Sequence, residues 1–231
     1  MSVLLRTACA ASVVVLVASC GALIDPGVDD QVLEFPEREF RLDASEWEFA
    51  AGNVAPTLSC AMCGSREKDL CSGDACRVAC DAPTQECLAE TNLVLSETID
   101  LLADGAGFAQ LEGMNVSVVL DQVKFDVVSN SLNVATPPLQ IYLAPITVAD
   151  PTDPRARWIG VVDPIQPGKT GAIDVDLTAN GRADLQQYLG EYLTPFNLLV
   201  TGNVVVHAGD PLPTGNLVAR VRVRGHADLG Q

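Results

Sequence analysis

Six cysteines crowd one short segment of the chain, and thiols at such spacing can do three kinds of chemistry. They are Cys60, Cys63, Cys71, Cys76, Cys80 and Cys87. Thiolates two or three residues apart can bind zinc, and a Cys-x-x-Cys pair can act as a redox dithiol. An even number of close cysteines in an oxidising compartment instead forms disulfides. The choice depends on where the chain resides.

Residues 1–19 have the three parts of an export signal: a positive Arg6, an apolar run over residues 8–18, and a small-residue cleavage site. The run is shorter than the roughly 20 apolar residues that span a bilayer. Val17-Ala18-Ser19-Cys20 resembles the lipobox of bacterial lipoproteins. The resemblance implies cleavage before Cys20 and acyl chains, palmitate among them, on this residue as a membrane anchor. The alternative is an ordinary cleaved signal peptide.

Gly21 follows the lipobox where enterobacterial lipoproteins retained at the inner membrane have Asp. The resemblance therefore favours the outer membrane, with the domain periplasmic or surface-exposed in the cell envelope. Export also places the six cysteines in an oxidising compartment, so we expect three structural disulfides. Fifteen pairings remain open. Zinc is disfavoured because oxidation competes with it, and a redox role because no strand leads into the Cys60–Cys63 pair.

Residues for catalysis are sparse. The two histidines, His207 and His226, have Asp210 and Asp228 nearby in sequence. However, neither Gly-x-Ser-x-Gly nor Ser-x-x-Lys supplies a nucleophile. We therefore interpret both histidines as solvated surface residues and expect no enzymatic activity, and a hydrolytic enzyme is the third-ranked function.

Carboxylates could bind calcium, which takes six to eight oxygen ligands. Asp174 and Asp176 alternate with apolar residues and would share one strand face, while Asp150, Asp153 and Asp163 fall in neighbouring loops. No EF-hand spacing is present, so no cofactor is expected, with calcium as the weak alternative. Glycoside hydrolysis is disfavoured, because the sequence offers no aromatic platform on which a sugar could stack.

Arg220, Arg222 and Arg224 form a basic stripe on one face of a predicted strand. Cross-strand pairing with Asp and Glu is the favoured interpretation, and binding of an anionic group such as a lipid headgroup is the alternative. The chain as a whole has 14 basic and 30 acidic residues and a formal net charge of −16. Nucleic acid is therefore excluded as a partner, because it requires clustered cations.

The elements that must position these residues are mostly strands. Apolar and polar residues alternate through much of the chain, which is typical of half-buried strands. Between Val118 and Val127 the alternation changes phase near Asp121-Gln122, which predicts a β-bulge or a strand break. The expected strands are a pair at 32–35 and 39–42, and others at 47–49, 93–101, 116–127, 139–143, 158–162, 173–177, 198–206 and 217–223.

Helical spacing predicts a helix over 183–193, with Thr178 or Asn180 as its N-cap, and a shorter one within 101–111. Many short strands with few helices indicate a mainly β fold: an antiparallel β-sandwich, immunoglobulin-like or similar. We predict a signal peptide at 1–19, a lipidated tether at 20–30, and one β-sandwich domain at 31–231 with a disulfide-stapled cysteine-rich insertion at 58–90.

The region 116–143 contains Val-x-Phe-x-Val from Val123, then Asn130-Ser131-Leu132-Asn133 and Pro137-Pro138-Leu139. This pattern resembles the strand-turn core of the LEA14/WHy family of stress-related β-sandwiches, although that family's Asn-Pro-Asn is absent. The resemblance implies a sandwich fold. The expected function is a non-enzymatic structural or binding module whose partners are the membrane and other envelope proteins. The alternative is a carrier or chaperone for an apolar ligand such as lipid.

Overall fold

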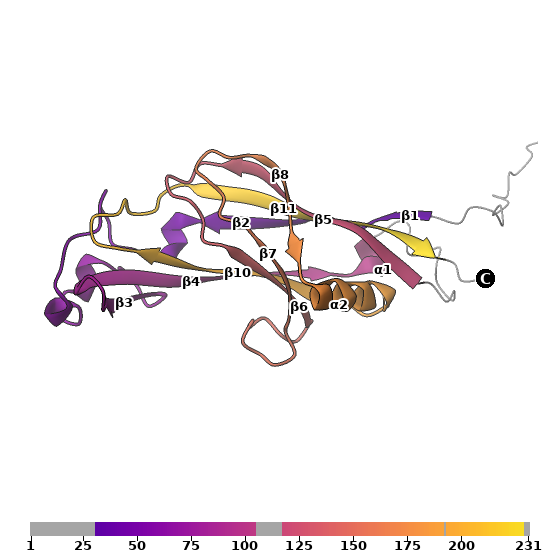
Figure 1. Ribbon diagram of the computed structural model, residues 1–231, viewed down its shortest axis with the longest axis horizontal. Coiled ribbons are helices and arrows are strands. Elements are labelled where there is room, and N and C mark those ends of the chain that lie inside the picture. The colour runs from indigo at the N-terminus through magenta and orange to yellow at the C-terminus, as the bar shows by residue number, and fades with distance from the viewer. Residues whose placement is uncertain (1–30, 105–116, 192, 229–231) are drawn as a thin grey trace, which may run out of the picture.

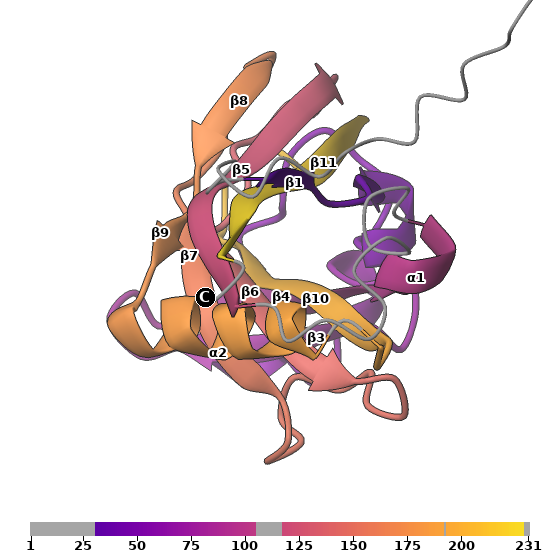
Figure 2. The ribbon, with the colours of Figure 1, turned by 90° about the vertical axis from the view of Figure 1, so that its right-hand side faces the viewer.

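Two antiparallel sheets lie face to face and form a β-sandwich, as the alternation pattern predicted (Figures 1 and 2). The computed structural model describes residues 31–104, 117–191 and 193–228. The predicted mainly β fold, with two helices and a disulfide-stapled cysteine-rich segment, is therefore confirmed.

The five-stranded sheet is built around β11 and β5. Its strands are β1 (Gln31–Glu34), β2 (Arg38–Asp43), β5 (Ser117–Asn130), β8 (Gly171–Asp174) and β11 (Asn216–Asp228). The predicted pairing between the first two strands is wrong, because β1 and β2 both pair with β11 and follow one another along its edge. Pro36 separates them, since proline has no amide hydrogen to donate to a ladder.

The six-stranded sheet has the order β3-β4-β10-β6-β7-β9. Its strands are β3 (Cys76–Asp81), β4 (Glu86–Ile99), β6 (Leu139–Pro145), β7 (Arg157–Val162), β9 (Asp176–Leu177) and β10 (Phe196–Val206). The cysteine-rich segment supplies β3 and the start of β4, so it extends this sheet at one end.

The change of phase near Asp121-Gln122 is a bulge within one continuous strand, and the alternative of a strand break is wrong. Gln122 pairs with Arg224 and Leu120 pairs with Gly225, so Asp121 is the extra residue of β5. The bulge keeps Leu120 and Val123 both buried, although three positions separate them. A regular strand would place those two side chains on opposite faces.

Two strand predictions need correction. The segment 173–177 is two strands in different sheets, because β8 pairs with β5 and β9 pairs with β7. The chain crosses between the sheets at Val175, which is buried. The predicted strand at 47–49 is wrong, because Trp47 is the last residue of a 3₁₀ helix, Ala44–Trp47, and Phe49 forms only an isolated bridge with Cys71. The cap of this helix, Asp43, accepts a hydrogen bond from the Ser45 amide at 3.0 Å.

The helix α2 (Ala179–Gly190) covers one end of the sandwich (Figure 2). It begins four residues before the predicted start, because Thr178 Oγ1 accepts a hydrogen bond from the Gly181 amide at 2.8 Å. The helix α1 (Leu101–Asp104) occupies the start of the predicted 101–111 helix. The rest of that prediction lies outside the described residues. Short 3₁₀ helices span Cys60–Met62 and Glu67–Asp69.

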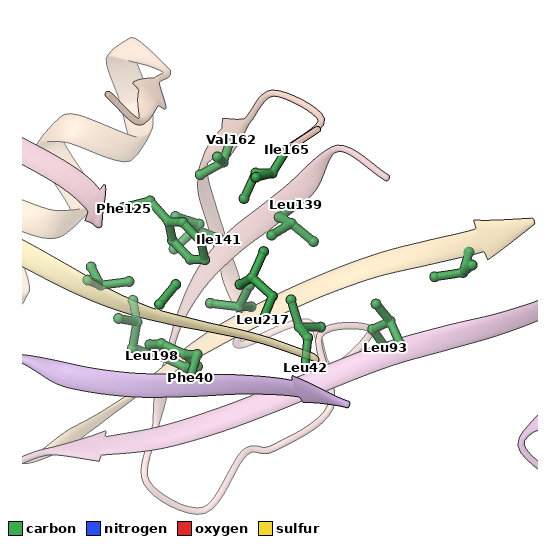
Figure 3. Close-up of a cluster of buried hydrophobic side chains, with 14 of the residues drawn as sticks. Phe40, Leu42, Leu93, Phe125, Leu139, Ile141, Val162, Ile165, Leu198 and Leu217 are labelled. Carbon is green, nitrogen blue, oxygen red and sulfur yellow. The ribbon is translucent and has the colours of Figure 1, made fainter. Parts of the chain in front are cut away.

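Aliphatic side chains and a few phenylalanines fill the space between the sheets (Figure 3). Phe40 and Phe125 come from the five-stranded sheet, and Leu139 and Ile141 face them from the other sheet. Burying each such side chain contributes roughly 1.5–3 kcal/mol before entropy costs are subtracted. This core joins the two sheets, whose outer faces carry the polar side chains.

Candidate functional site

Three disulfides staple the end of the molecule at β3 and β4, as the even number of cysteines predicted. Cys80 and Cys87 face each other across the β3–β4 hairpin. Each is bonded to a cysteine of the preceding turn. The pairs are Cys60–Cys80, Cys63–Cys87 and Cys71–Cys76, with Cα separations of 5.0, 5.5 and 5.4 Å. Because Cys60 and Cys63 have different partners, they do not form the internal Cys-x-x-Cys disulfide of a redox centre.

The arginine stripe lies on the outer face of the five-stranded sheet. Arg222 contacts Glu37 at 2.8 Å and Asp126 at 2.9 Å. Arg220 contacts Glu39 at 3.3 Å and Glu37 at 3.5 Å. Glu37 follows Pro36 at the break between β1 and β2, so this break places a carboxylate within reach of both guanidinium groups. All these side chains except Asp126 are more than a third exposed, and such pairs contribute little to stability.

Arg224 lies one step further along the stripe and lines a shallow hollow of about 450 Å³. Lys124 and Arg222 line the same hollow, together with Gln122 and Glu37. Lys124 is itself 3.7 Å from Asp174. The cations of the stripe are thus interleaved with carboxylates, and the hollow is a mixed-charge surface.

The two histidines lie at opposite ends of the sandwich. His226, near the end of β11, has Nδ1 2.9 Å from Oδ1 of Asp121, the bulge residue of β5. His207 follows β10 at the stapled end, where its backbone amide donates to Asp210 at 2.9 Å. These positions exclude a shared catalytic site for the two imidazoles. Asp121 is a partner that the sequence did not suggest, because only the bulge brings it to His226.

The aspartates that could have bound calcium do not gather at one place. Asp174 and Asp176 belong to strands of different sheets, so they do not share a strand face as expected. Asp150 and Asp153 accept hydrogen bonds from Thr152 and Arg155 within their own turns. The Arg155 side chain lowers the pKa of Asp153 to about 2. Within the described ranges, no three His, Cys, Asp or Glu side chains are grouped to hold a metal ion.

An apolar cavity lies between the sheets beside α2. Leu185 and Leu189 of the helix line it, together with Ile141 from β6 and Val221 from β11. Its volume is about 20 Å³, which is room for about one water molecule. Pockets that hold small ligands measure roughly 300–1,000 Å³. The core beside α2 is therefore essentially filled.

A groove that the sequence did not predict crosses the outer face of the six-stranded sheet, and we call it the polar groove. Its volume is about 340 Å³. Asn92 of β4, Thr201 and Asn203 of β10 and Gln140 of β6 form its floor, and Asp150 and Thr152 of the β6–β7 connection form one wall. The convergence of these floor residues depends on the order of β4, β10 and β6 in the sheet.

One buried amide anchors the wall of the polar groove. Asn197, on the outer side of β10 and only 4% exposed, donates to the carbonyl oxygens of Ile146 at 3.2 Å and Val148 at 2.9 Å. Its own oxygen accepts from Thr98 Oγ1 at 2.7 Å. Val148 then packs on Ala144 and Leu199 in a small second core. The wall is thus attached to the sheet by both hydrogen bonds and apolar contacts.

The predicted lipidation site, Cys20, and the export signal lie outside the described residues. In the part of the chain that the structure describes, no helix combines the length and apolar character needed to cross a membrane. The chain matches no protein-family model, and comparisons with curated proteins and with solved structures give no match either.

Proposed function

We propose that this chain is a bacterial envelope lipoprotein, anchored through Cys20, whose β-sandwich is a non-enzymatic structural or binding module. The anchor rests on the lipobox-like Val17-Ala18-Ser19-Cys20 at the end of an export signal. Two or three acyl chains hold a protein stably at a membrane without a transmembrane helix.

The filled core beside α2 favours a binding module over a carrier. A carrier for lipid needs an interior space for an acyl chain, whereas the cavity beside α2 measures about 20 Å³. Opening a larger cavity would remove apolar contacts at a cost of roughly 24 cal/mol per Å³. Within the described residues, the filled core beside α2 favours recognition on the outer surfaces of the domain.

The stapled end also supports a binding module. The segment between Cys60 and Cys87 has few large buried side chains, and its three bridges hold it in one conformation. Rigid loops on a scaffold are the usual location of binding residues, because little entropy is lost when a partner binds.

The test is to extract the full chain from the bacterial membrane in mild detergent and to measure its intact mass by native mass spectrometry. We expect a mass equal to residues 20–231 plus acyl chains, with no additional lipid retained in the folded protein. Reduction should add the mass of two hydrogens for each opened bridge. The matched control is Cys20→Ser, which should be recovered without acyl chains and in the soluble fraction.

Two results would contradict the proposal. An unlipidated wild-type chain would make this a secreted protein and remove the anchor. A stoichiometric lipid that stays bound after detergent exchange would instead favour the carrier function.

A further inference from the structure

The polar groove has the composition of a site for a neutral, polyhydroxylated ligand. We propose that it binds a saccharide, which names the ligand class of the module proposed above and rests on that function. Its floor brings together the amides of Asn92, Gln140 and Asn203 and the hydroxyl of Thr201 from three adjacent strands. Amides and hydroxyls both donate and accept hydrogen bonds, as sugar hydroxyls do.

The amide of Gln140 is already held in one orientation. Tyr142 donates its hydroxyl hydrogen to Gln140 Oε1 at 2.6 Å, so the carbonyl end of that amide has a partner and its NH₂ group is left to donate. Asn92 and Asn203 are exposed and face each other across the β4–β10 pair. Neighbouring amides on paired strands can bind adjacent hydroxyls of one sugar ring, because cross-strand side chains lie about 4.5–5.5 Å apart at Cβ.

The charges around the groove disfavour ionic ligands. In a chain with a formal net charge of −16, the groove contains one carboxylate, Asp150, and no cation among its lining residues. Asp150 already accepts from both the amide and the hydroxyl of Thr152, at 2.8 and 2.7 Å. An anionic ligand would meet no positive partner there, and a cationic one would have to compete with these two bonds.

The rest of the lining suits the apolar side of a sugar ring. Val94 is 46% exposed on the floor, and Pro138 and Pro151 also line the groove. C–H groups of a pyranose pack on such surfaces while its hydroxyls contact the amides. The volume of about 340 Å³ lies at the lower end of the range of small-molecule pockets.

The groove is also formed before any ligand binds. Asn197 holds the β6–β7 connection against the sheet through Ile146 and Val148, and the Asp150–Thr152 turn closes on itself. A rigid wall lowers the entropy lost on binding. A saccharide would therefore dock without rearrangement of the sheet.

The experiment probes the oxidised full chain on an array of neutral gluco-, manno-, galacto- and chito-oligosaccharides, with sulfated oligosaccharides on the same array. The detergent must not be a glycoside, because its headgroup would compete. The strongest neutral tetrasaccharide is then titrated by calorimetry into the wild type and into Asn92→Ala/Asn203→Ala. We expect saturable binding to neutral sugars, weakened at least about tenfold by the double substitution.

Two further variants separate binding from folding. Asn53→Ala removes an exposed amide in a loop outside the groove and should bind like the wild type. Asn203→Trp fills the groove without removing buried contacts and should abolish binding while the melting temperature stays within a few degrees.

No binding to any neutral oligosaccharide, binding only to sulfated ones, or neutral binding that survives both groove variants would overturn the saccharide proposal. None of these outcomes affects the lipoprotein module itself, because acylation at Cys20 and recovery from the membrane are measured separately.

Discussion

The buried amide of Asn197 offers the sharpest test of how the outer face of the six-stranded sheet is built. The substitution is Asn197→Asp, which keeps the side chain's shape and replaces its NH₂ group by a carboxylate oxygen. Two carbonyl oxygens, of Ile146 and Val148, then lose their donor at 3.2 and 2.9 Å and face a negative charge.

Each hydrogen bond lost from a buried group costs about 1–1.5 kcal/mol. The two together predict a loss of about 2–3 kcal/mol in the free energy of unfolding at pH 7. For a domain of this size, that corresponds to a fall in melting temperature of about 4–12 °C.

The loss should depend on pH in a defined direction. Burial and the two carbonyl oxygens disfavour the ionised form of the introduced carboxyl, so its pKa in the folded state is raised above the unfolded value of about 3.9. A protonated carboxyl can again donate to one carbonyl. Part of the lost stability should therefore return as the pH falls through the raised folded pKa toward about 3.9.

The assay is urea unfolding at several pH values. The matched control is Asn203→Asp on the same strand and the same outer face, where the side chain is exposed; it should change stability by less than about 0.5 kcal/mol. The reasoning is refuted if Asn197→Asp is as stable as this control at pH 7, or if the two variants depend on pH in the same way.

Three other predictions follow from local geometry. A non-reduced peptide map should show Cys60–Cys80, Cys63–Cys87 and Cys71–Cys76; a Cys80–Cys87 peptide would contradict the hairpin arrangement. Within α2, Gly181→Ala should destabilise the fold by about 1–3 kcal/mol, because the new Cβ would lie 2.0 Å from the Ile159 carbonyl oxygen. The matched Gly190→Ala meets no atom within 4 Å and should be neutral or slightly stabilising in thermal melts. A carbon-13 NMR titration should place the Asp153 midpoint at about 2, and Arg155→Ala should return it toward the ordinary value. Because the folded pKa is lowered, the stability that this pair contributes is present above the unfolded pKa and is lost as the pH falls toward 2.

The outer faces show how much of the structure the alternation of residues within a strand could predict. Arg220, Arg222 and Arg224 were placed on one exposed face by their spacing alone, and the structure has them there. Glu37, the carboxylate partner of Arg220 and Arg222, was not predictable, because it reaches the stripe only after β1 and β2 align end to end along β11. The same holds for Asp121 and His226, which meet across paired strands.

The sequence by itself determined the mainly β class, the exposed face of the arginine strand, the change of phase near Asp121 and the number of disulfides. These features depend on alternation within a strand and on residue counts, which are local properties of the chain. The tertiary structure alone decided which cysteines pair, that residues 173–177 divide between two sheets, and that Asn92, Gln140 and Asn203 share one groove. Strand order and register join residues far apart in the chain, and many registers satisfy the same alternation. The free energy of packing the whole sandwich selects among them, and no short segment contains that information.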